Sequence, residues 1–410
     1  MEFRALRGIE DLIPPESEKF EKVVETFKDV VKRAGFKEIV LPILEEARLF
    51  TRSVGETTDI VQKEMYIFED KGGRVVALRP EGTASSVRAY IEHGVYAKEP
   101  FTKWFYVGPM FRFERPQAGR KRQFFQAGCE VFGLASPGVD AEVIRIACDI
   151  LESLGIRYSL EVNSIGCEKC RPTFKEKLVS FLESKKELLC EDCQKRFHRN
   201  PLRVLDCKNE VCRKVVEEAP KIVETLCDEC KEHFEKLKEY LKVLEVTFIE
   251  NPYLVRGLDY YTRTVFEFKS ENLGAQSTVL AGGRYDRLIS ELGGPETPAL
   301  GFALGIDRAM ILLEEEPKER EGVFIVVRGE SAYLKGLKLL KFLRSKGIKA
   351  EMDHRLGSFK AQMKAADRAF SKYVVIIGEA EEKEGFFSLK ELETGKQERI
   401  ETLEELLARL

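Results

Sequence analysis

The sequence predicts an α+β protein: an antiparallel sheet flanked by helices, interrupted by a mainly helical insertion and followed by a small α/β domain. Two strand-like segments joined by a turn-rich stretch predict a long hairpin within residues 101–134. Residues 166–245 are rich in Lys, Glu and Cys with few strand signals, whereas strands alternate with helices in the last part of the chain. Because 410 residues exceed one ordinary compact core, we divide the chain into domains 1–320 and 321–410.

The start of the chain predicts a helix and then a strand. Residues 15–34 repeat apolar side chains at helical spacing, and Pro15 suits the first helical turn. Gly35 ends this helix. Residues 37–41 then predict a strand, which Pro42 limits because a proline cannot donate to a ladder.

The hairpin joins FTKWFYVGPMFRFE to QFFQAGCEVFG through the turn PQAGRK. Successive side chains of a strand point to opposite faces. The second strand therefore has two different faces: Gln126, Gly128 and Glu130 on one, and Ala127, Cys129 and Val131 on the other. Burying an unpaired charge costs roughly several kcal/mol, so charged groups on such apolar strands need partners. They indicate either an internal Arg–Glu network or a ligand site.

The turn of the hairpin is basic, with Arg115, Arg120, Lys121 and Arg122. One interpretation is a solvated turn. The other is a loop at the mouth of a polar sheet face that clamps a polyphosphate through bidentate contacts. The chain contains neither a GxxxxGKS/T loop nor a GxGxxG fingerprint, so a nucleotide would have to be bound by arginines on a sheet.

A second polar motif, LRPEGT at residues 78–83, places Glu81 and Thr83 in a turn that contains Gly82. A carboxylate and a hydroxyl two residues apart suit an ammonium group, while helix capping by Thr83 is the alternative. The four histidines of the chain are scattered, which argues against nucleophilic triad chemistry.

The later segments complete the predicted domains. Residues 253–268 predict a strand, 281–286 are glycine-rich, and 298–313 predict an apolar strand that passes into a helix. The acidic, helix-like stretch 312–322 is the predicted linker. The last domain predicts strands at GVFIVVRG, IKAEMDH and YVVIIGE, separated by two amphipathic helices.

Composition limits the class of protein. The chain is 43% hydrophobic and 33% charged, as soluble globular proteins are, and its formal net charge is -3. A nucleic-acid ligand would be held by local basic surface, which disfavours a DNA-coating protein. Neither a membrane span nor a signal-peptide core is predicted. We therefore expect a cytoplasmic protein with no membrane association, whose ten cysteines are free thiols or metal ligands.

In this order the segments resemble the histidyl-tRNA synthetases, a family of class II aminoacyl-tRNA synthetases. Residues 35–46 resemble the first class II motif, 111–133 the second, and 299–313 the third. Residues 254–268 and 280–288 resemble two peptides peculiar to the histidine enzyme.

The resemblance implies a class II antiparallel sheet, an anticodon-binding α/β domain at 321–410, and a homodimer joined through the first motif around Pro42. It also implies the reaction. L-histidine is activated with ATP to histidyl-adenylate and pyrophosphate, and histidine is then transferred to the 3′ end of tRNA(His). Placement and charge stabilisation suffice for this chemistry, so no protein nucleophile is needed.

The resemblance further implies a set of histidine-binding residues: Glu81, Gly82, Thr83, Arg112, Gln126, Glu130, Arg256, Tyr260, Tyr261 and Tyr285. Within this set, Glu81 and Thr83 hold the α-ammonium group, with Gln126 on the carboxylate side. Glu130, with Tyr261 and Tyr285, recognises the imidazole. The implied ATP-binding residues are Arg112, Arg120 and Arg308, together with Mg²⁺. Arg112 and Arg256, both against the α-phosphate, are the implied catalytic residues.

Two positions depart from the family pattern. Ile9 stands where a threonine is usual, and Asp307 stands where a glutamate usually precedes the arginine of the third motif. An aspartate keeps the charge but shortens the reach, which leaves the metal or ATP geometry open.

Two other functions remain open at this point. One is a non-catalytic regulatory paralogue that acts as a subunit of ATP phosphoribosyltransferase in histidine biosynthesis. Such paralogues typically lack the C-terminal domain and parts of the histidine and ATP sites, which this chain keeps. The other is a class II synthetase for Thr, Pro or Gly, against which RGLDYY and AGGRYD argue.

The insertion holds a separate signal in its cysteines: Cys167, Cys170, Cys190, Cys193, Cys207, Cys212, Cys227 and Cys230. Six of them form CxxC pairs, which are typical of zinc sites in a reduced compartment. Buried free cysteines are also common as small apolar residues, and catalysis in the resembled family needs no zinc. The sequence leaves both interpretations open and predicts no metal ligand at the active site.

Overall fold

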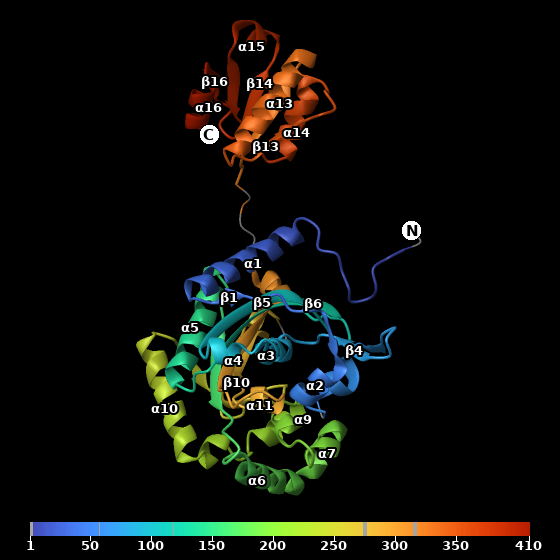
Figure 1. Cartoon of the computed structure of the whole chain (residues 1–410), viewed down its shortest axis with the longest axis vertical. Helices are drawn as coiled ribbons and strands as arrows, with labels where there is room; N and C mark the ends of the chain where they lie inside the picture. Colours follow the sequence, from blue (N-terminus) through green and yellow to red (C-terminus); the bar gives the residue numbers. More distant parts are fainter. Residues whose placement is uncertain (1–2, 57, 118, 274–276, 315–316, 318) are drawn as a thin grey trace. The chain divides into compact units, whose positions relative to one another are not determined.

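The computed structural model describes residues 3–56, 58–117, 119–273, 277–314, 317 and 319–410. The chain forms two compact units, Met1–Glu314 and Glu315–Leu410 (Figure 1). No helix among the described residues is long and apolar enough to cross a membrane.

The first unit is built on an eight-stranded sheet in the order β1-β5-β6-β11-β10-β9-β7-β8. Its central strands are antiparallel, and only the edge pairs β1–β5 and β7–β8 are parallel. The strands are β1 (Lys37–Glu38), β5 (Thr102–Phe111), β6 (Gln123–Phe132), β7 (Ser159–Ser164), β8 (Ile249–Glu250), β9 (Thr262–Lys269), β10 (Thr278–Arg284) and β11 (Ala299–Gly305). The predicted antiparallel sheet and its hairpin, now β5 and β6, are confirmed.

Helices α1 (Glu16–Arg33), α5 (Pro137–Ser153) and α12 (Ile306–Leu312) pack together over one face of this sheet. Helix α1 is amphipathic: Val23, Phe27, Val30 and Val31 are buried, while acidic residues lie in its first turn and basic residues in its last. That charge order favours the helix dipole. The predicted N-terminal helix is confirmed.

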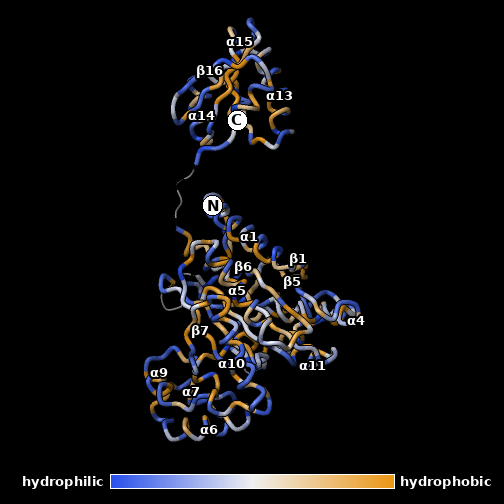
Figure 2. The backbone as a smooth tube through the Cα atoms, turned by 90° about the vertical axis from the view of Figure 1, so that its left-hand side faces the viewer, coloured by the Kyte–Doolittle hydropathy of each residue, from blue (hydrophilic) through white to orange (hydrophobic). Residues whose placement is uncertain are grey.

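The predicted two faces of β6 are also confirmed, and they separate the core from the pocket. Ala127, Cys129 and Val131 lie in the main core with the α1 side chains. Gln126 lines a pocket on the opposite side of the sheet. Figure 2 shows the apolar strands running through the middle of this unit and polar segments around its periphery.

Two predicted strands are shorter than the sequence indicated. The strand expected at 37–41 ends at Glu38, and further along the carbonyls of Leu41 (2.9 Å) and Pro42 (3.2 Å) accept from Arg79 Nη1 instead of from a neighbouring strand. The strand expected at 253–268 begins only at Thr262.

The segment 253–261 is a loop rather than a strand, because arginine side chains of the insertion, and not a neighbouring strand, donate hydrogen bonds to its carbonyls. Arg203 donates to the Gly257 carbonyl and Arg171 to the Tyr261 carbonyl. Helix α12 ends at Leu312, and beyond it the described residues of the predicted linker 312–322 are not helical. Residues 315, 316 and 318 of that linker lie outside the described residues.

A smaller sheet that the sequence did not predict flanks the pocket, in the order β2-β4-β3. Its strands and the neighbouring helices are β2 (Leu44–Glu46), β3 (Ile67–Glu69), β4 (Val75–Leu78), α2 (Ala47–Val54), α3 (Thr83–Glu92), α4 (Val95–Lys98) and α11 (Leu288–Glu291). Strand β4 leads into the turn that begins α3, so it places the LRPEGT motif beside the large sheet.

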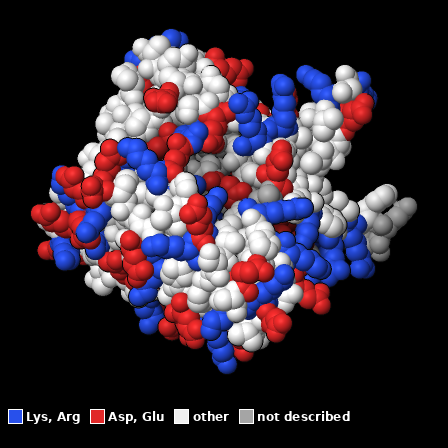
Figure 3. All heavy atoms as spheres, turned by 90° about the horizontal axis from the view of Figure 1, so that it is seen from below, with Lys and Arg blue, Asp and Glu red and all other residues white. Residues whose placement is uncertain are grey.

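The insertion is helical, as predicted, with α6 (Arg171–Ser184), α7 (Glu191–Arg196), α8 (Leu202–Leu205), α9 (Glu210–Val216) and α10 (Asp228–Val243). Phe174, Leu178 and Leu182 of α6 share a core cluster with Tyr260 and Tyr261. The insertion therefore packs against the loop that leads into β9. Acidic and basic side chains are interspersed over the face shown in Figure 3, in keeping with the small net charge of -3.

The second unit is an α/β domain with the strand order β13-β12-β14-β15-β16. Its elements are β12 (Val323–Val327), α13 (Glu330–Ser345), β13 (Ala350–Met352), α14 (Phe359–Arg368), β14 (Tyr373–Ile377), α15 (Glu379–Glu384), β15 (Phe387–Glu391), β16 (Gln397–Ile400) and α16 (Leu403–Arg409). The three predicted strands and two predicted helices are confirmed, and the strands pair in parallel. The antiparallel pair β15–β16 and the last two helices were not predicted.

Candidate active site

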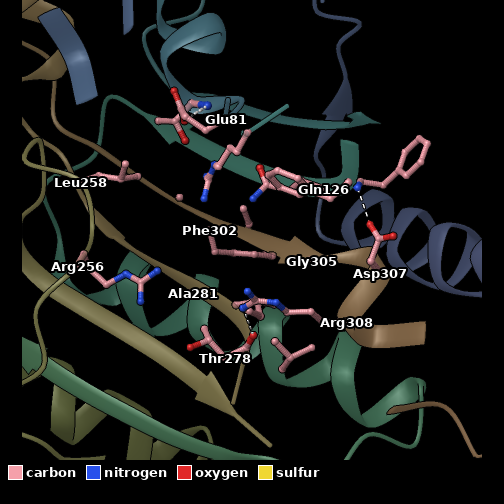
Figure 4. Close-up of a pocket in the computed structure, with 18 of the residues that line it drawn as sticks. Glu81, Gln126, Arg256, Leu258, Thr278, Ala281, Phe302, Gly305, Asp307 and Arg308 are labelled. Carbon is pink, nitrogen blue, oxygen red and sulfur yellow. Dashed lines mark hydrogen bonds between the residues drawn. The ribbon is translucent and has the colours of Figure 1, made fainter. Parts of the chain in front are cut away.

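A pocket on the open face of the large sheet gathers most of the predicted site residues (Figure 4). Those that line it are Glu81, Thr83, Arg112, Arg120, Gln126, Arg256, Tyr260, Tyr261, Tyr285 and Arg308. They come from segments far apart in the sequence: the β4–α3 turn, the β5–β6 hairpin, the loop before β9, the end of β10 and the start of α12. Gly82 and Glu130 are not among the lining residues.

Glu130 lies directly beneath the pocket and is fully buried. Three hydroxyls donate to its carboxyl group: Thr83 Oγ1 at 2.8 Å, Tyr106 at 3.3 Å and Tyr285. Burial raises the pKa of Glu130 to about 8, although these hydrogen bonds oppose the rise. Because Thr83 and Tyr285 also line the pocket, a ligand that contacts them is one hydrogen bond away from this carboxyl group.

Tyr106 is a residue of this site that the sequence analysis did not single out. Its ring fills the space beside two glycines: a Cβ atom at Gly82 or Gly128 would lie 2.3 Å from Tyr106 atoms. A Cβ atom at Gly301 would lie 2.0 Å from the Glu130 carboxylate. Because these glycines have no side chain, they leave room for Tyr106 and for the Glu130 carboxyl group to pack side by side at the base of the pocket. An aromatic residue flanked by glycines on paired strands is the only sequence signal for this arrangement.

Glu81 caps helix α3, and Thr83 does not. The Glu81 carboxylate accepts from the backbone N–H groups of Thr83 (2.7 Å) and Ala84 (2.8 Å). Burial raises the pKa of Glu81, but these bonds, with the Arg112 charge, act in the opposite direction. The capping alternative therefore applies to Glu81, and the Thr83 hydroxyl is left to donate to Glu130.

Three arginines cluster at the other end of the pocket. Arg308 is held by the carbonyls of Gly119 (3.1 Å) and Thr278 (2.7 Å), and Arg120 pairs with Glu114 at 2.9 Å. Burial and the nearby charges of Arg120 and Arg112 lower the pKa of Arg308. Like charges held close together favour binding of an anion. The basic-loop interpretation with a polyphosphate ligand is therefore the one that fits this geometry.

Arg112 is positioned mainly by the main chain, with one longer ion pair to Glu114. Its Nε donates to the Pro80 carbonyl at 2.9 Å, and its guanidinium group lies 5.2 Å from the centre of the Phe124 ring. Glu114 is 3.8 Å away. The guanidinium group therefore stands between the LRPEGT turn and the hairpin, where both halves of the pocket meet.

Arg256 faces Arg308 across the pocket, and Figure 4 shows the two guanidinium groups pointing toward one another. Glu267 lies 3.5 Å from Arg256 and raises its pKa, although burial opposes this. Arg256 Nε and Gln126 Oε1 are buried and have no hydrogen-bond partner among the described residues. Buried polar atoms without partners are costly, so both atoms call for a polar ligand in this pocket.

Asp307, the departure in the third motif, acts on the hairpin. Its carboxylate accepts from the backbone N–H of Phe125 at 2.7 Å and pairs with Lys121 at 3.1 Å. Lys121 also pairs with Glu10, next to Ile9. Both departures therefore lie where the N-terminal segment, the hairpin and α12 meet.

A buried ion pair that was not predicted from the sequence fixes the end of β10, directly before Tyr285. Arg284 and Asp140 are both fully buried, and Arg284 Nε donates to the two carboxylate oxygens at 2.8 and 3.0 Å. His233 (2.8 Å) and Thr264 (2.6 Å) complete the hydrogen bonds of Asp140. This network joins β9, β10, α5 and α10, so it holds the floor of the pocket to the insertion. Only the charged residue inside the glycine-rich AGGRYD segment hinted at it.

Comparisons with known proteins agree with this arrangement. The family model "Histidyl-tRNA synthetase" matches residues 8–309, and "Anticodon binding domain" matches residues 322–410. The histidine–tRNA ligase of Aquifex aeolicus (strain VF5) is 54% identical over 98% of this chain and 100% of its own length. That of Halothermothrix orenii is 48% identical, covering 98% of this chain and 97% of the relative. The crystal structure of apo S. aureus histidyl-tRNA synthetase has a TM-score of 0.82 at 37% identity, covering 99% of both chains.

Proposed function

The chain belongs to the histidyl-tRNA synthetase family, and we propose that the pocket activates L-histidine with ATP and passes it to tRNA(His). Its activity is that of an aminoacyl-tRNA ligase rather than of the regulatory paralogue, because the curated ligases match it over its whole length. The observation that carries the assignment to this pocket is the pair of partnerless polar atoms, Arg256 Nε and Gln126 Oε1, between a buried carboxyl group and an arginine cluster.

Histidine is proposed to lie over the Glu130 end of the pocket. Its imidazole N–H donates to Glu130 in place of one of the hydroxyls, with Tyr261 and Tyr285 beside the ring. The α-ammonium group lies against Glu81 and Thr83, and Gln126 lies on the carboxylate side of the ligand. A buried carboxyl group rejects side chains without a matching N–H because it would then lose a hydrogen bond without recovering water.

ATP is proposed to lie over the arginine end, with its outer phosphates on Arg120 and Arg308. Arg112 and Arg256 contact the α-phosphate from two sides. The histidine carboxylate attacks the α-phosphorus in line, the bond to the bridging oxygen breaks, and pyrophosphate leaves with that electron pair. The arginines stabilise the negative charge that develops on the equatorial oxygens, so the protein supplies placement and charge.

Mg²⁺ is proposed to enter with ATP. This cation usually keeps several waters and binds phosphate oxygens with one or two carboxylates. Among the described pocket-lining residues, Glu114 offers a carboxylate beside the phosphate-facing arginines, which fits one such contact. Removal of divalent cations with EDTA should abolish pyrophosphate exchange, and added Mg²⁺ should restore it.

The second half-reaction transfers histidine to a ribose hydroxyl at the 3′ end of tRNA(His), which attacks the carbonyl carbon of the adenylate and releases AMP. The unit Glu315–Leu410 is proposed to bind the anticodon, because its family model is that of an anticodon-binding domain. We place the reaction in the cytoplasm, where the ten cysteines, all unbridged here, stay reduced.

The direct test is ATP–pyrophosphate exchange with each of the twenty amino acids. We expect exchange with histidine alone. No exchange from folded protein would favour the regulatory function, and exchange with another amino acid would overturn the proposed pocket.

A homodimer is proposed to form through the first motif and the small sheet. Apolar side chains are exposed there: Val40 (93%), Ile43, Leu44, Ile67, Phe68 and Val75. Such a patch favours a partner surface, and a second copy of the chain satisfies it by two-fold symmetry. Sedimentation velocity should give a dimer for the unmodified protein and for the control Val243→Lys, and a monomer for Val40→Lys with Phe68→Lys. A monomeric unmodified protein would contradict this.

A further inference from the structure

Eight of the ten cysteines converge in two groups of four within the insertion. We call them the outer tetrad (Cys167, Cys170, Cys227 and Cys230) and the inner tetrad (Cys190, Cys193, Cys207 and Cys212). Within each tetrad all four sulfur atoms lie within 4.8 Å of one another. The tetrads are nested along the chain, since the inner one lies entirely between Cys170 and Cys227.

The sulfur spacing fits a single tetrahedral ion. A zinc–sulfur bond of about 2.3 Å places the corners of a tetrahedron about 3.8 Å apart. In the outer tetrad, Cys167 Sγ lies 3.7 Å from Cys170 Sγ and 3.8 Å from Cys227 Sγ. In the inner tetrad, Cys190 Sγ lies 3.9 Å from Cys207 Sγ. In iron–sulfur clusters the four cysteines are divided among two or four irons, so their sulfur atoms do not all lie as close together as in these tetrads.

The local backbone suits thiolate ligands. Cys170, Cys190 and Cys227 each occupy the residue before a helix, at the positive end of its dipole. Backbone N–H groups donate to two of the sulfurs, from Cys227 to Cys170 Sγ (3.1 Å) and from Cys190 to Cys212 Sγ (3.2 Å). The Arg196 guanidinium group lies 3.5 Å from Cys193 Sγ, which offsets negative charge on that tetrad. Hydrogen bonds of this kind support and orient metal ligands.

We propose that the insertion holds two structural zinc ions, one in each tetrad. Packing of free cysteines as apolar side chains does not account for the arrangement, because one half of each tetrad is only partly buried: Cys167, Cys190, Cys207 and Cys227. Four protein sulfurs leave no open position, so each site is structural rather than catalytic. Binding one Zn²⁺ to four thiols releases four protons to solvent and forms four zinc–sulfur bonds.

The two ions would cross-link short helices that are not stable by themselves. Helices α7, α8 and α9 have six, four and seven residues, below the length at which isolated helices are stable. The outer tetrad joins the start of α6 to the start of α10, which closes the insertion at its base.

The cross-linked insertion also contacts a loop of the active site, and the importance of this contact rests on the function proposed above. Arg171, next to Cys170, donates to the Tyr261 carbonyl, and Arg203, between the inner cysteines, donates to the Gly257 carbonyl. The loop carrying Arg256 is therefore fixed from the insertion. Zinc acts here as a positioning element for that loop and takes no part in the reaction.

The test is metal analysis of the full-length protein purified without chelators, by inductively coupled plasma mass spectrometry. We expect two zinc ions per chain. Two double variants, Cys227→Ser with Cys230→Ser and Cys207→Ser with Cys212→Ser, should each retain one. Cys148→Ala, a buried cysteine outside both tetrads, is the matched control and should retain two.

A second measurement uses the unmodified protein, so it tests the proposal even if the cysteine variants do not fold. Thiol titration under native conditions should leave the eight tetrad cysteines unreactive, and denaturation should release them together with two equivalents of zinc. Fewer than two zinc ions per chain, iron in place of zinc, or eight reactive thiols in folded protein would overturn the proposal. Metal content is independent of pyrophosphate exchange, so failure here and failure of the proposed function are distinguishable.

Discussion

Replacing Glu130 with glutamine tests two effects of this carboxyl group separately: its effect on the free energy of unfolding and its effect on histidine activation. The side chain is fully buried and burial raises its pKa to about 8. An ordinary glutamate titrates near about 4.3, so between these two values the folded protein keeps a proton that the unfolded chain releases. The free energy of unfolding should therefore fall as pH rises through this window and level off above about pH 8.

The magnitude follows from the same shift. One pKa unit corresponds to about 1.4 kcal/mol, so the loss across the window approaches roughly 5 kcal/mol as an upper limit. Glu130→Gln cannot ionise and should lack this slope. The two proteins should unfold with similar free energies near about pH 5, and the variant should be the more stable by several kcal/mol, roughly, at about pH 8.5. Urea unfolding across this range measures it, with the exposed Glu314→Gln as control.

Histidine activation should change in the opposite direction. Because Glu130 is largely neutral at neutral pH, its hydrogen bond to the imidazole is worth roughly 0.5–1.5 kcal/mol, which corresponds to a loss of about 2-fold to 12-fold in kcat/KM for histidine. Pyrophosphate exchange measures this loss. Parallel pH dependence of the two proteins would refute the raised pKa of Glu130, and activity within twofold of the unmodified enzyme would refute its role in binding.

Three further changes test other parts of the site. Arg256→Ala should lower the rate of adenylate formation by about 10²–10³-fold in single-turnover assays, while the exposed Arg157→Ala leaves it unchanged; equal rates would remove Arg256 from the mechanism. Arg284→Met should lower the free energy of unfolding by about 3–5 kcal/mol in urea titrations, because Asp140 is left buried without its cation; a loss under about 1 kcal/mol would contradict this. Asp307→Asn removes the charge facing Lys121 and should raise the KM for ATP about 2–5-fold in exchange assays, with the KM for histidine unchanged; the reverse pattern would disprove the link to the hairpin.

The sequence was sufficient for features that depend on periodicity and local composition. Alternation along β6 predicted which side chains enter the core and which face the pocket, because a strand leaves no other choice once one face is apolar. Apolar residues at helical spacing predicted the long helix α1, and the alternation of strand-like and helix-like segments predicted the second unit. The set of pocket residues needed the family resemblance, since segments from Glu81 to Arg308 meet only through the order of the strands.

Features that depend on hydrogen bonds between residues far apart in the sequence could not be predicted from the sequence. The segment before β9 has strand-like composition, but arginines of the insertion bind its carbonyls and keep it out of the sheet. Tyr106 and Arg284 are ordinary strand residues until the fold brings Glu130 and Asp140 against them. In each case the deciding interaction joins residues more than twenty positions apart, which no local pattern contains.

Several groups of the pocket are in energetically unfavourable states in the ligand-free protein. Substrate binding can relieve these states, which explains how binding energy can be directed to the reaction. Three arginines repel one another, Arg256 Nε and Gln126 Oε1 lack partners, and Glu130 is held largely as a neutral acid at neutral pH. In the proposed function, a different part of the substrates relieves each of these states. The outer phosphates neutralise the arginines, the α-phosphate gives Arg256 a partner, and the imidazole N–H gives Glu130 a hydrogen-bond donor. Main-chain carbonyls hold Arg112 and Arg308, and the insertion holds the loop that carries Arg256, so these groups are kept close together. Relief therefore requires both substrates at once, which is the condition for forming the adenylate.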